Sequence, residues 1–353
     1  MKVIDAHTHL SGSESEESAE GIVACLDVCE VENAFVFAPL LNVHTWELTD
    51  KHLDDIRAHN SYSADLCSRA PERLYGFCVL NPVPRLAGGS FKRAVELMIE
   101  EVRRCYHELG LRGVKMIPTH WYPNDPEIIP LYQAIAQLGM YVVFHVGIFM
   151  DGQQGSYCRP TYFEVIRQVP GLRVQLAHLG WPWVDECIAV LNMEPNIHGS
   201  EPKQWQLRAD LSFGPPDDWQ LSSWQRAVDS LSPEMLCYGS DLFWPVTPDQ
   251  YLEEYLHPQR GLFEVALTNG HIAKEGSSGR KKLREKIGPG GALQRHERER
   301  AMDIKGGGEA NGDRRGAPIV SPHAAAARCR LPRRWRGGAA RGRADFGACT
   351  TRP

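Results

Sequence analysis

Apolar segments with strand character recur at even spacing over residues 2–242 and alternate with segments of helical periodicity. We predict strands at 2–10, 33–40, 74–81, 113–118, 141–147, 173–180, 206–213 and 235–242. Between them, helical periodicity is clearest at 91–109, 127–138, 183–191 and 217–230. Repeats of strand and helix of about 30 residues are typical of right-handed βαβ units and a parallel sheet. Eight such units in about 270 residues predict a (β/α)8 TIM barrel, with a doubly wound sheet as the alternative.

The first predicted strand carries two histidines, His7 and His9, near its carboxyl end. Side chains in a strand alternate between its two faces, so residues two positions apart point the same way. Both imidazoles can therefore converge on one cation. The pair is not specific alone, because two polar residues at a strand end also fit this pattern.

Three further predicted strands end in a residue that can bind a metal. His145 ends the fifth strand, His178 the sixth and Asp241 the eighth. In a parallel barrel the carboxyl ends of all strands lie at one mouth, where residues are typically catalytic. Five such placements are hard to explain as separate strand ends or turns, so they predict one metal site.

The residue types of this group fit a divalent transition metal. Imidazoles and a carboxylate suit Zn²⁺ best, with Mn²⁺, Fe²⁺ or Co²⁺ as alternatives. We expect one ion, held by His7, His9, His145 and Asp241, with a water in the remaining position. Asp241 can also accept a proton, and His178 is best used beside the metal as a general base or as a polariser of the substrate.

The chain resembles the amidohydrolase superfamily, in the amidohydrolase 2 branch that includes aminocarboxymuconate-semialdehyde decarboxylase. The resemblance covers about residues 1–287 and rests on five segments: Asp5-Ala-His7-Thr-His9, Gly113-Val-Lys115, Phe144-His145-Val-Gly147, Ala177-His178-Leu-Gly180 and Gly239-Ser-Asp241. It implies that His7, His9, His145 and Asp241 bind a metal and that His178 assists water or substrate. It also implies that Lys115, on strand four, bridges two metals if the site is binuclear; we favour a structural or charge-balancing role.

Three functions remain open. The leading hypothesis is a hydrolase, in which metal-bound hydroxide attacks an amide, ester or lactone carbonyl of a small organic acid. The alternative is non-oxidative decarboxylation of an aromatic or unsaturated carboxylic acid at the same site, for which cationic groups should bind the substrate carboxylate. The third is a barrel that binds without turnover. Loops at the mouth add candidate substrate contacts to Lys115, namely His120, Tyr122 and Arg159.

Composition separates the last part of the chain from the rest. Residues 1–272 contain 19 Lys and Arg against 36 Asp and Glu, and residues 273–353 contain 20 against 8, so their net charges are −17 and +12. We predict a barrel domain at 1–287, ending in a helix at 280–287, and a basic Gly/Arg/Ala/Pro-rich tail at 288–353 that is disordered. A nucleic-acid-binding arm and translation from a shifted reading frame are two other interpretations of the tail.

The remaining features predict a soluble enzyme that acts on a small molecule. No apolar run is long enough to span a membrane, and the first strand leaves no room for a leader peptide, so we expect a cytoplasmic protein without a membrane or nucleic-acid partner. The ten cysteines show no zinc pattern and are expected to be reduced. The oligomeric state is open, and a homodimer is compatible with the sequence.

Overall fold

The structure, a computed structural model, describes residues 3–13, 16–40, 52–149, 154–199, 201–212 and 217–262. The predicted helix at 280–287 and the predicted tail at 288–353 lie outside these residues. Within the described part of the chain, no helix is both long and apolar enough to cross a membrane.

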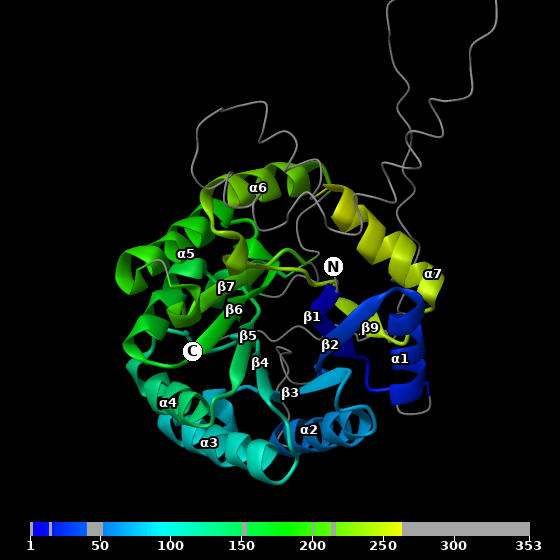
Figure 1. The fold of residues 1–353 in the computed structure, drawn as a ribbon. Helices are drawn as coiled ribbons and strands as arrows, with labels where there is room; N and C mark the ends of the chain where they lie inside the picture. The colour runs from blue at the N-terminus through cyan, green and yellow to red at the C-terminus, as the bar shows by residue number, and fades with distance from the viewer. Residues whose placement is uncertain are drawn as a thin grey trace, which may run out of the picture. The chain divides into compact units, whose positions relative to one another are not determined.

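The strands form one parallel sheet in chain order. They are β1 (Val3–Leu10), β2 (Val31–Phe37), β3 (Leu74–Leu80), β4 (Gly113–Met116), β5 (Tyr141–Phe144), β6 (Arg173–Leu176), β7 (Leu207–Asp210), β8 (Leu236–Cys237) and β9 (Leu242–Trp244). Each of β1 to β7 pairs with the strand that follows it, and β9 pairs with β1. Helices surround this ring of strands (Figure 1).

A helix follows each strand from β1 to β7, and one helix follows β8 and β9 together. The α-helices are α1 (Ala19–Val28), α2 (His52–Ser68), α3 (Phe91–His107), α4 (Ile129–Gln137), α5 (Val184–His198), α6 (Asp217–Ser230) and α7 (Pro248–Gln250), the last continued by a π-helical segment, Tyr251–Leu256. After β5 the helical position is filled by a 3-10 helix, Pro160–Gln168, which the sequence pattern did not predict. The predicted (β/α)8 barrel is therefore confirmed, and the doubly wound sheet is excluded.

The eighth predicted strand is broken where the barrel closes. β8 pairs with β7, β9 pairs with β1, and the segment between them hydrogen-bonds to β1. Ala6 N donates to Tyr238 O at 3.0 Å, and Asp241 N donates to His7 O at 2.8 Å. These bonds close the ring across the break and fix Asp241 beside His7.

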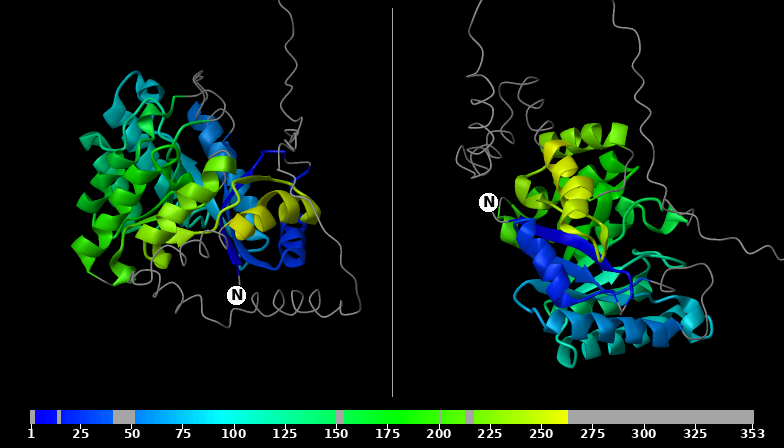
Figure 2. Two further views of the ribbon diagram at one scale, coloured as in Figure 1. Left: turned by 90° about the horizontal axis from the view of Figure 1, so that it is seen from above. Right: turned by 90° about the vertical axis from the view of Figure 1, so that its right-hand side faces the viewer.

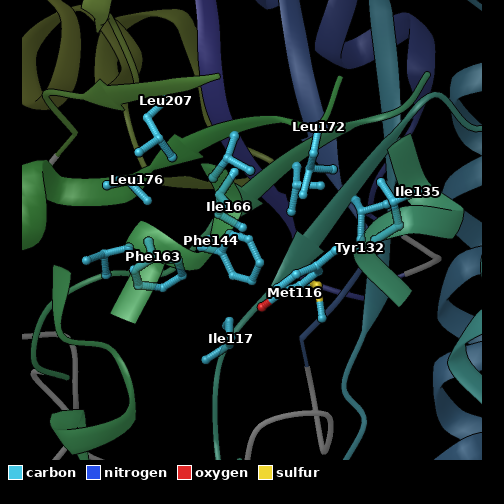
Figure 3. Packing of buried hydrophobic residues seen from close by; sticks show 14 of the residues in the cluster. Met116, Ile117, Tyr132, Ile135, Phe144, Phe163, Ile166, Leu172, Leu176 and Leu207 are labelled. Atoms are coloured by element: carbon cyan, nitrogen blue, oxygen red, sulfur yellow. The ribbon is translucent and has the colours of Figure 1, made fainter. Parts of the chain in front are cut away.

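Alternation along the strands separates an apolar outer layer from an interior that holds polar groups beside a smaller apolar cluster of Phe37, Phe77 and Val143. The outward residues of β4 to β7 belong to one buried apolar cluster with the helices, and they are Val114, Met116, Val142, Phe144, Val174, Leu176, Leu207 and Ala209. Figure 3 shows part of this cluster, with Met116, Phe144, Leu176 and Leu207 labelled. The inward positions of the same strands include Lys115, Gln175 and Asp210, all buried. Burying apolar area outside the ring stabilises the barrel and leaves its interior free for polar groups.

The last helical segment is anchored to the first strand. Figure 2 shows α7 and its continuation beside α1 and β1 in both views. The Tyr251 hydroxyl donates to Asp5 Oδ2 at 2.7 Å, and Asp5 Oδ1 accepts from Ser240 N at 3.0 Å and His7 N at 3.2 Å. A single buried carboxylate thus joins β1, the strand break and the helix that follows.

Candidate metal centre

Three potential ligand atoms meet at the carboxyl ends of β1 and β8. His7 Nε2 and His9 Nε2 lie 3.1 Å apart, and Asp241 Oδ1 lies 3.0 Å from the first and 3.1 Å from the second. Both histidines are buried, and Asp241 is 26% exposed in its side chain. The predicted grouping of these three residues matches one candidate metal-binding cluster in the described part of the chain.

The spacing of these atoms fits a shared cation. Ligands about 2.1 Å from a metal are separated by roughly 3.0 to 3.4 Å in octahedral or tetrahedral arrangements. Lone pairs this close repel one another unless a proton or a cation lies between them. Among the described residues, His9 Nδ1 and His145 Nε2 are also buried without a hydrogen-bond partner. The donor set is therefore suited to a divalent metal.

His145 and His178 extend the group along the mouth of the barrel. They lie just beyond the ends of β5 and β6, which are shorter than predicted. His178 Nε2 is 3.2 Å from His145 Nδ1, and His178 Nδ1 is 3.9 Å from Asp241 Oδ2. His145 is outside the tightest ligand cluster, so its place as a metal ligand stays a prediction.

Asp210, at the end of β7, is a buried member of the site that the sequence interpretation missed. Its Oδ2 lies 3.1 Å from His7 Nδ1 and 2.6 Å from Gln175 Nε2, and its Oδ1 accepts from His178 N at 2.9 Å. With His7 and His178 it forms a second candidate ligand group. The available signal was an acidic residue in the second half of the seventh predicted strand, 206–213, because the rule that placed site residues near the carboxyl ends of strands one, five, six and eight also applies to strand seven.

Two of the site residues adopt a backbone conformation that is uncommon outside glycine. His178 has φ 58° and Asp241 has φ 61°. Left-handed backbone costs a non-glycine residue about 1–2 kcal/mol and tends to occur at functional sites. The bonds from His178 N to Asp210 and from Asp241 N to His7 hold these conformations in place.

Burial keeps most of these imidazoles neutral. Burial lowers the pKa of His9 to about 3 and that of His178 to about 4, and burial with nearby His178 lowers the pKa of His145 well below its usual value. For His7, burial and Lys115 act to lower the pKa, but Asp241 and Asp210 outweigh them and raise it. Neutral imidazole is the form that binds metals, so a bound metal would oppose this rise in the pKa of His7.

Lys115 is part of this group. Its Nζ lies 3.1 Å from His7 Nε2 and 4.8 Å from the centre of the Phe37 ring, and the residue is 1% exposed. Burial lowers the pKa of its ammonium to about 8. The structure therefore places a cation-forming side chain against the candidate metal ligands.

The other three predicted substrate contacts lie in loops that follow β4 and β5. Tyr122 is half-exposed and packs on Tyr157 with ring centres 4.8 Å apart; the His120 ring lies 6.2 Å from that of Tyr157. Arg159 Nε donates to Glu186 Oε2 at 2.9 Å. The role of these three side chains in substrate binding stays a prediction.

A parallel barrel with histidines and carboxylates at its carboxyl mouth is typical of metal-dependent enzymes. The model of the amidohydrolase family (amidohydrolase 2) matches residues 4–274, and the chain belongs to this family. The predicted family resemblance is thereby confirmed.

The chain is similar to several decarboxylases at low sequence identity. A 2-amino-3-carboxymuconate-6-semialdehyde decarboxylase of Dictyostelium discoideum is 27% identical over 154 residues, which cover 38% of this chain and 40% of the relative. Among solved structures, 2,6-dihydroxybenzoate decarboxylase from Rhizobium is 13% identical, with a TM-score of 0.47 over 75% of this chain and 99% of that one. A 5-carboxyvanillate decarboxylase from Sphingomonas paucimobilis is 15% identical, with a TM-score of 0.49 over 75% and 93%.

Proposed function

We propose that this enzyme catalyses non-oxidative decarboxylation of a small aromatic or unsaturated carboxylic acid at one divalent metal ion. The observation that carries the proposal is the buried Lys115 ammonium beside His7. The carboxylates of Asp241 and Asp210 act on this ammonium already, and a carboxylate substrate would supply a further anion for it, because a buried charge is stable only when it is paired. The name of the relative, a decarboxylase, points the same way.

The metal would be held by His7, His9 and Asp241, with His145 Nε2 as a fourth ligand. Zn²⁺ fits these ligands, and Mn²⁺, Fe²⁺ and Co²⁺ are the alternatives. When bound, the ion would supply positive charge that holds substrate oxygens and stabilises the electron pair left on the substrate.

The side chains of the protein would bind the substrate and carry the proton. Lys115 would hold the carboxylate, which leaves as CO₂ when its bond to carbon breaks. His178 would take a proton from solvent at Nε2 and deliver it to the carbon that lost CO₂, so that one proton is consumed per turnover. Asp241 Oδ2, 3.9 Å from His178 Nδ1, would stabilise the protonated ring.

Hydrolysis of an amide, ester or lactone, the leading hypothesis from the sequence, becomes the second candidate. It is supported by the same His178 and Asp241 pair, which could accept the proton of an attacking water. Lys115 has no necessary part in that reaction. A cytoplasmic location and a homodimer stay predictions from the sequence.

The proposal is tested by assaying the zinc- and manganese-loaded protein against hydroxybenzoic acids, unsaturated dicarboxylic acids, lactones and amides. We expect CO₂ release, and a Lys115→Met variant should raise KM about 10- to 100-fold, the loss expected for a hydrogen bond to a charged group. Lys203→Met, which removes an exposed lysine, is the matched control. The proposal would be overturned if the protein hydrolysed lactones or amides to carboxylic acids but released no CO₂ from any of the carboxylic acids tested.

A further inference from the structure

We infer that Ser212 and Asp210 are positioning residues that hold His178 with its proton on Nδ1 and its lone pair on Nε2. The inference concerns the arrangement of ring protons. Only its catalytic consequence rests on the proposed function, in which His178 accepts a proton at Nε2.

Asp210 accepts hydrogen bonds through both of its carboxyl oxygens. The Oδ2 atom of Asp210 accepts from Gln175 Nε2 at 2.6 Å, so this carboxyl acts as an acceptor. Its Oδ1 accepts from the backbone N–H groups of His178, at 2.9 Å, and Ser212, at 3.1 Å. Ser212 Oγ is in close contact with the same oxygen. Two acceptors in such contact would repel, so the single hydroxyl hydrogen of Ser212 lies between them.

The Ser212 hydroxyl lies between Asp210 and the His178 ring. Its Oγ lies 2.8 Å from His178 Nδ1. Because the hydroxyl hydrogen is already donated to Asp210, the oxygen can only accept from the ring. His178 Nδ1 must therefore carry the proton, and a neutral imidazole then has its lone pair at Nε2.

His178 and Asp210 each contact a histidine that we propose as a metal ligand. His178 Nε2 lies 3.2 Å from His145 Nδ1, so His145 donates from Nδ1 and keeps its own lone pair at Nε2. That atom is buried without a partner among the described residues, as a metal-ligand atom would be before the metal binds. On its other side, Asp210 Oδ2 accepts from His7 Nδ1, which leaves the His7 lone pair at Nε2 as well. One carboxylate thus sets the ring protons of three histidines.

The experiment reads the ring nitrogens directly. Metal-free protein labelled with ¹⁵N-histidine is studied by NMR at one fixed pH, and His178 is assigned with a His178→Gln variant. We expect Nδ1–H in the unsubstituted protein, and at least half of the population as Nε2–H in Ser212→Ala. Ser212→Thr, which keeps the hydroxyl, should restore Nδ1–H.

Ser240→Ala is the matched control. Ser240 is equally buried and close to the site, but its hydroxyl bonds to the backbone of His7 and Leu242 rather than to an imidazole. In zinc-loaded protein, Ser212→Ala should lower kcat about 10- to 100-fold with KM and zinc content unchanged, which is part of the roughly 10²- to 10⁴-fold that general acid–base catalysis supplies. Ser240→Ala should change kcat less than about 3-fold.

Two results would overturn the inference: His178 carrying its proton on Nε2 in the unsubstituted protein, or the same Nδ1–H form in Ser212→Ala with a kcat equal to that of Ser240→Ala. Failure of the proposed function is recognised separately, because it leaves the NMR result standing while no carboxylic acid releases CO₂. If Ser212→Ala does not fold, the tautomer in the unsubstituted protein and in Ser212→Thr decides the matter.

Discussion

Asp241 has two roles in the proposed mechanism: it binds the metal, and it stabilises the protonated His178 ring. Burial acts to raise the pKa of its carboxyl, but His7 and His178 outweigh burial and hold the pKa well below its usual value. The group is therefore an anion at neutral pH, with Oδ1 toward His7 and His9 and Oδ2 toward His178. In the proposed mechanism, one oxygen faces the metal ligands His7 and His9, and the other faces the proton carrier His178.

Substitution of Asp241 by Asn should remove both tasks at little cost in volume. An amide is a weaker metal ligand and cannot stabilise protonated His178, so we expect turnover to fall about 10²- to 10⁴-fold. Initial rates on the substrate found in the screen measure the effect. Asp249→Asn, at the exposed start of α7, is the control. An Asp241→Asn enzyme as active as this control would remove Asp241 from the mechanism.

At the scale of elements, the broken eighth strand brings its backbone close to β1. Gly239 lies within the break, and a Cβ added there would come 2.7 Å from His7 Cβ and 3.4 Å from Ser212 Cβ. Because His7 Cβ is fixed to the backbone of a buried strand, it cannot rotate away. The close approach of β1 to the break therefore requires glycine at this position.

Gly239→Ala should displace His7 and weaken metal binding without touching any ligand atom. We expect the dissociation constant for Zn²⁺ to rise at least about 10-fold, in the range found when groups that support a ligand are lost. Competition with a chelating dye measures it. Gly261→Ala, in the helical segment after residue 256, is the control because an added Cβ there meets nothing within 4 Å. Equal zinc affinity in the two variants would contradict this account of the break.

The sequence was informative about elements where periodicity is strong. The α6 helix has its predicted bounds, and α3 ends two residues before the predicted Leu109. The break in strand eight was not predictable, because its cause is a left-handed Asp241 held by a backbone bond to β1, a contact between residues over 200 positions apart. Strands five and six were predicted too long, since apolar residues continue past the last ladder bond into the loops.

At the site, sequence reasoning located residues by strand ends but not the bonds between side chains. His7, His9 and Asp241 come together as predicted because β1 pairs with β9, which begins directly after Asp241. The network through Ser212 was not accessible, since a serine two positions after a strand carries no signal of its own. The Arg159 pairing with Glu186 likewise depends on how the loop after β5 packs against α5.

At the scale of the whole molecule, stability depends on buried charges between helices as well as on the apolar layer. Glu101 of α3 is buried against α2, where it accepts from Asn60 at 2.9 Å and from Arg104 Nη2 at 2.8 Å. Burial acts to raise the pKa of Glu101, but Arg104 and Asn60 outweigh it and lower the pKa below 4.5. Its charge therefore stabilises the folded state above about pH 4.5 and stops doing so as pH falls through the lower, folded-state pKa.

Glu101→Gln should destabilise the protein by about 2 kcal/mol at pH 7, the loss expected for hydrogen bonds to a charged group. The difference from the unsubstituted protein should shrink as pH falls below 4.5, because the unsubstituted carboxyl then becomes neutral as well. Urea unfolding at a series of pH values measures both effects. Glu96→Gln, on the exposed face of the same helix, is the control. A difference that stays constant down to pH 3 would contradict this role for Glu101.

The metal is the central claim, and the metal content of the purified protein tests it most directly. Protein prepared without chelators or a histidine tag is analysed by elemental mass spectrometry beside a His7→Ala/His9→Ala variant. The account predicts about one equivalent of a divalent transition metal in the unsubstituted protein and its loss in the variant, with both proteins folded by circular dichroism. Folded, unsubstituted protein that contains no metal and binds none when zinc or manganese is added would contradict it.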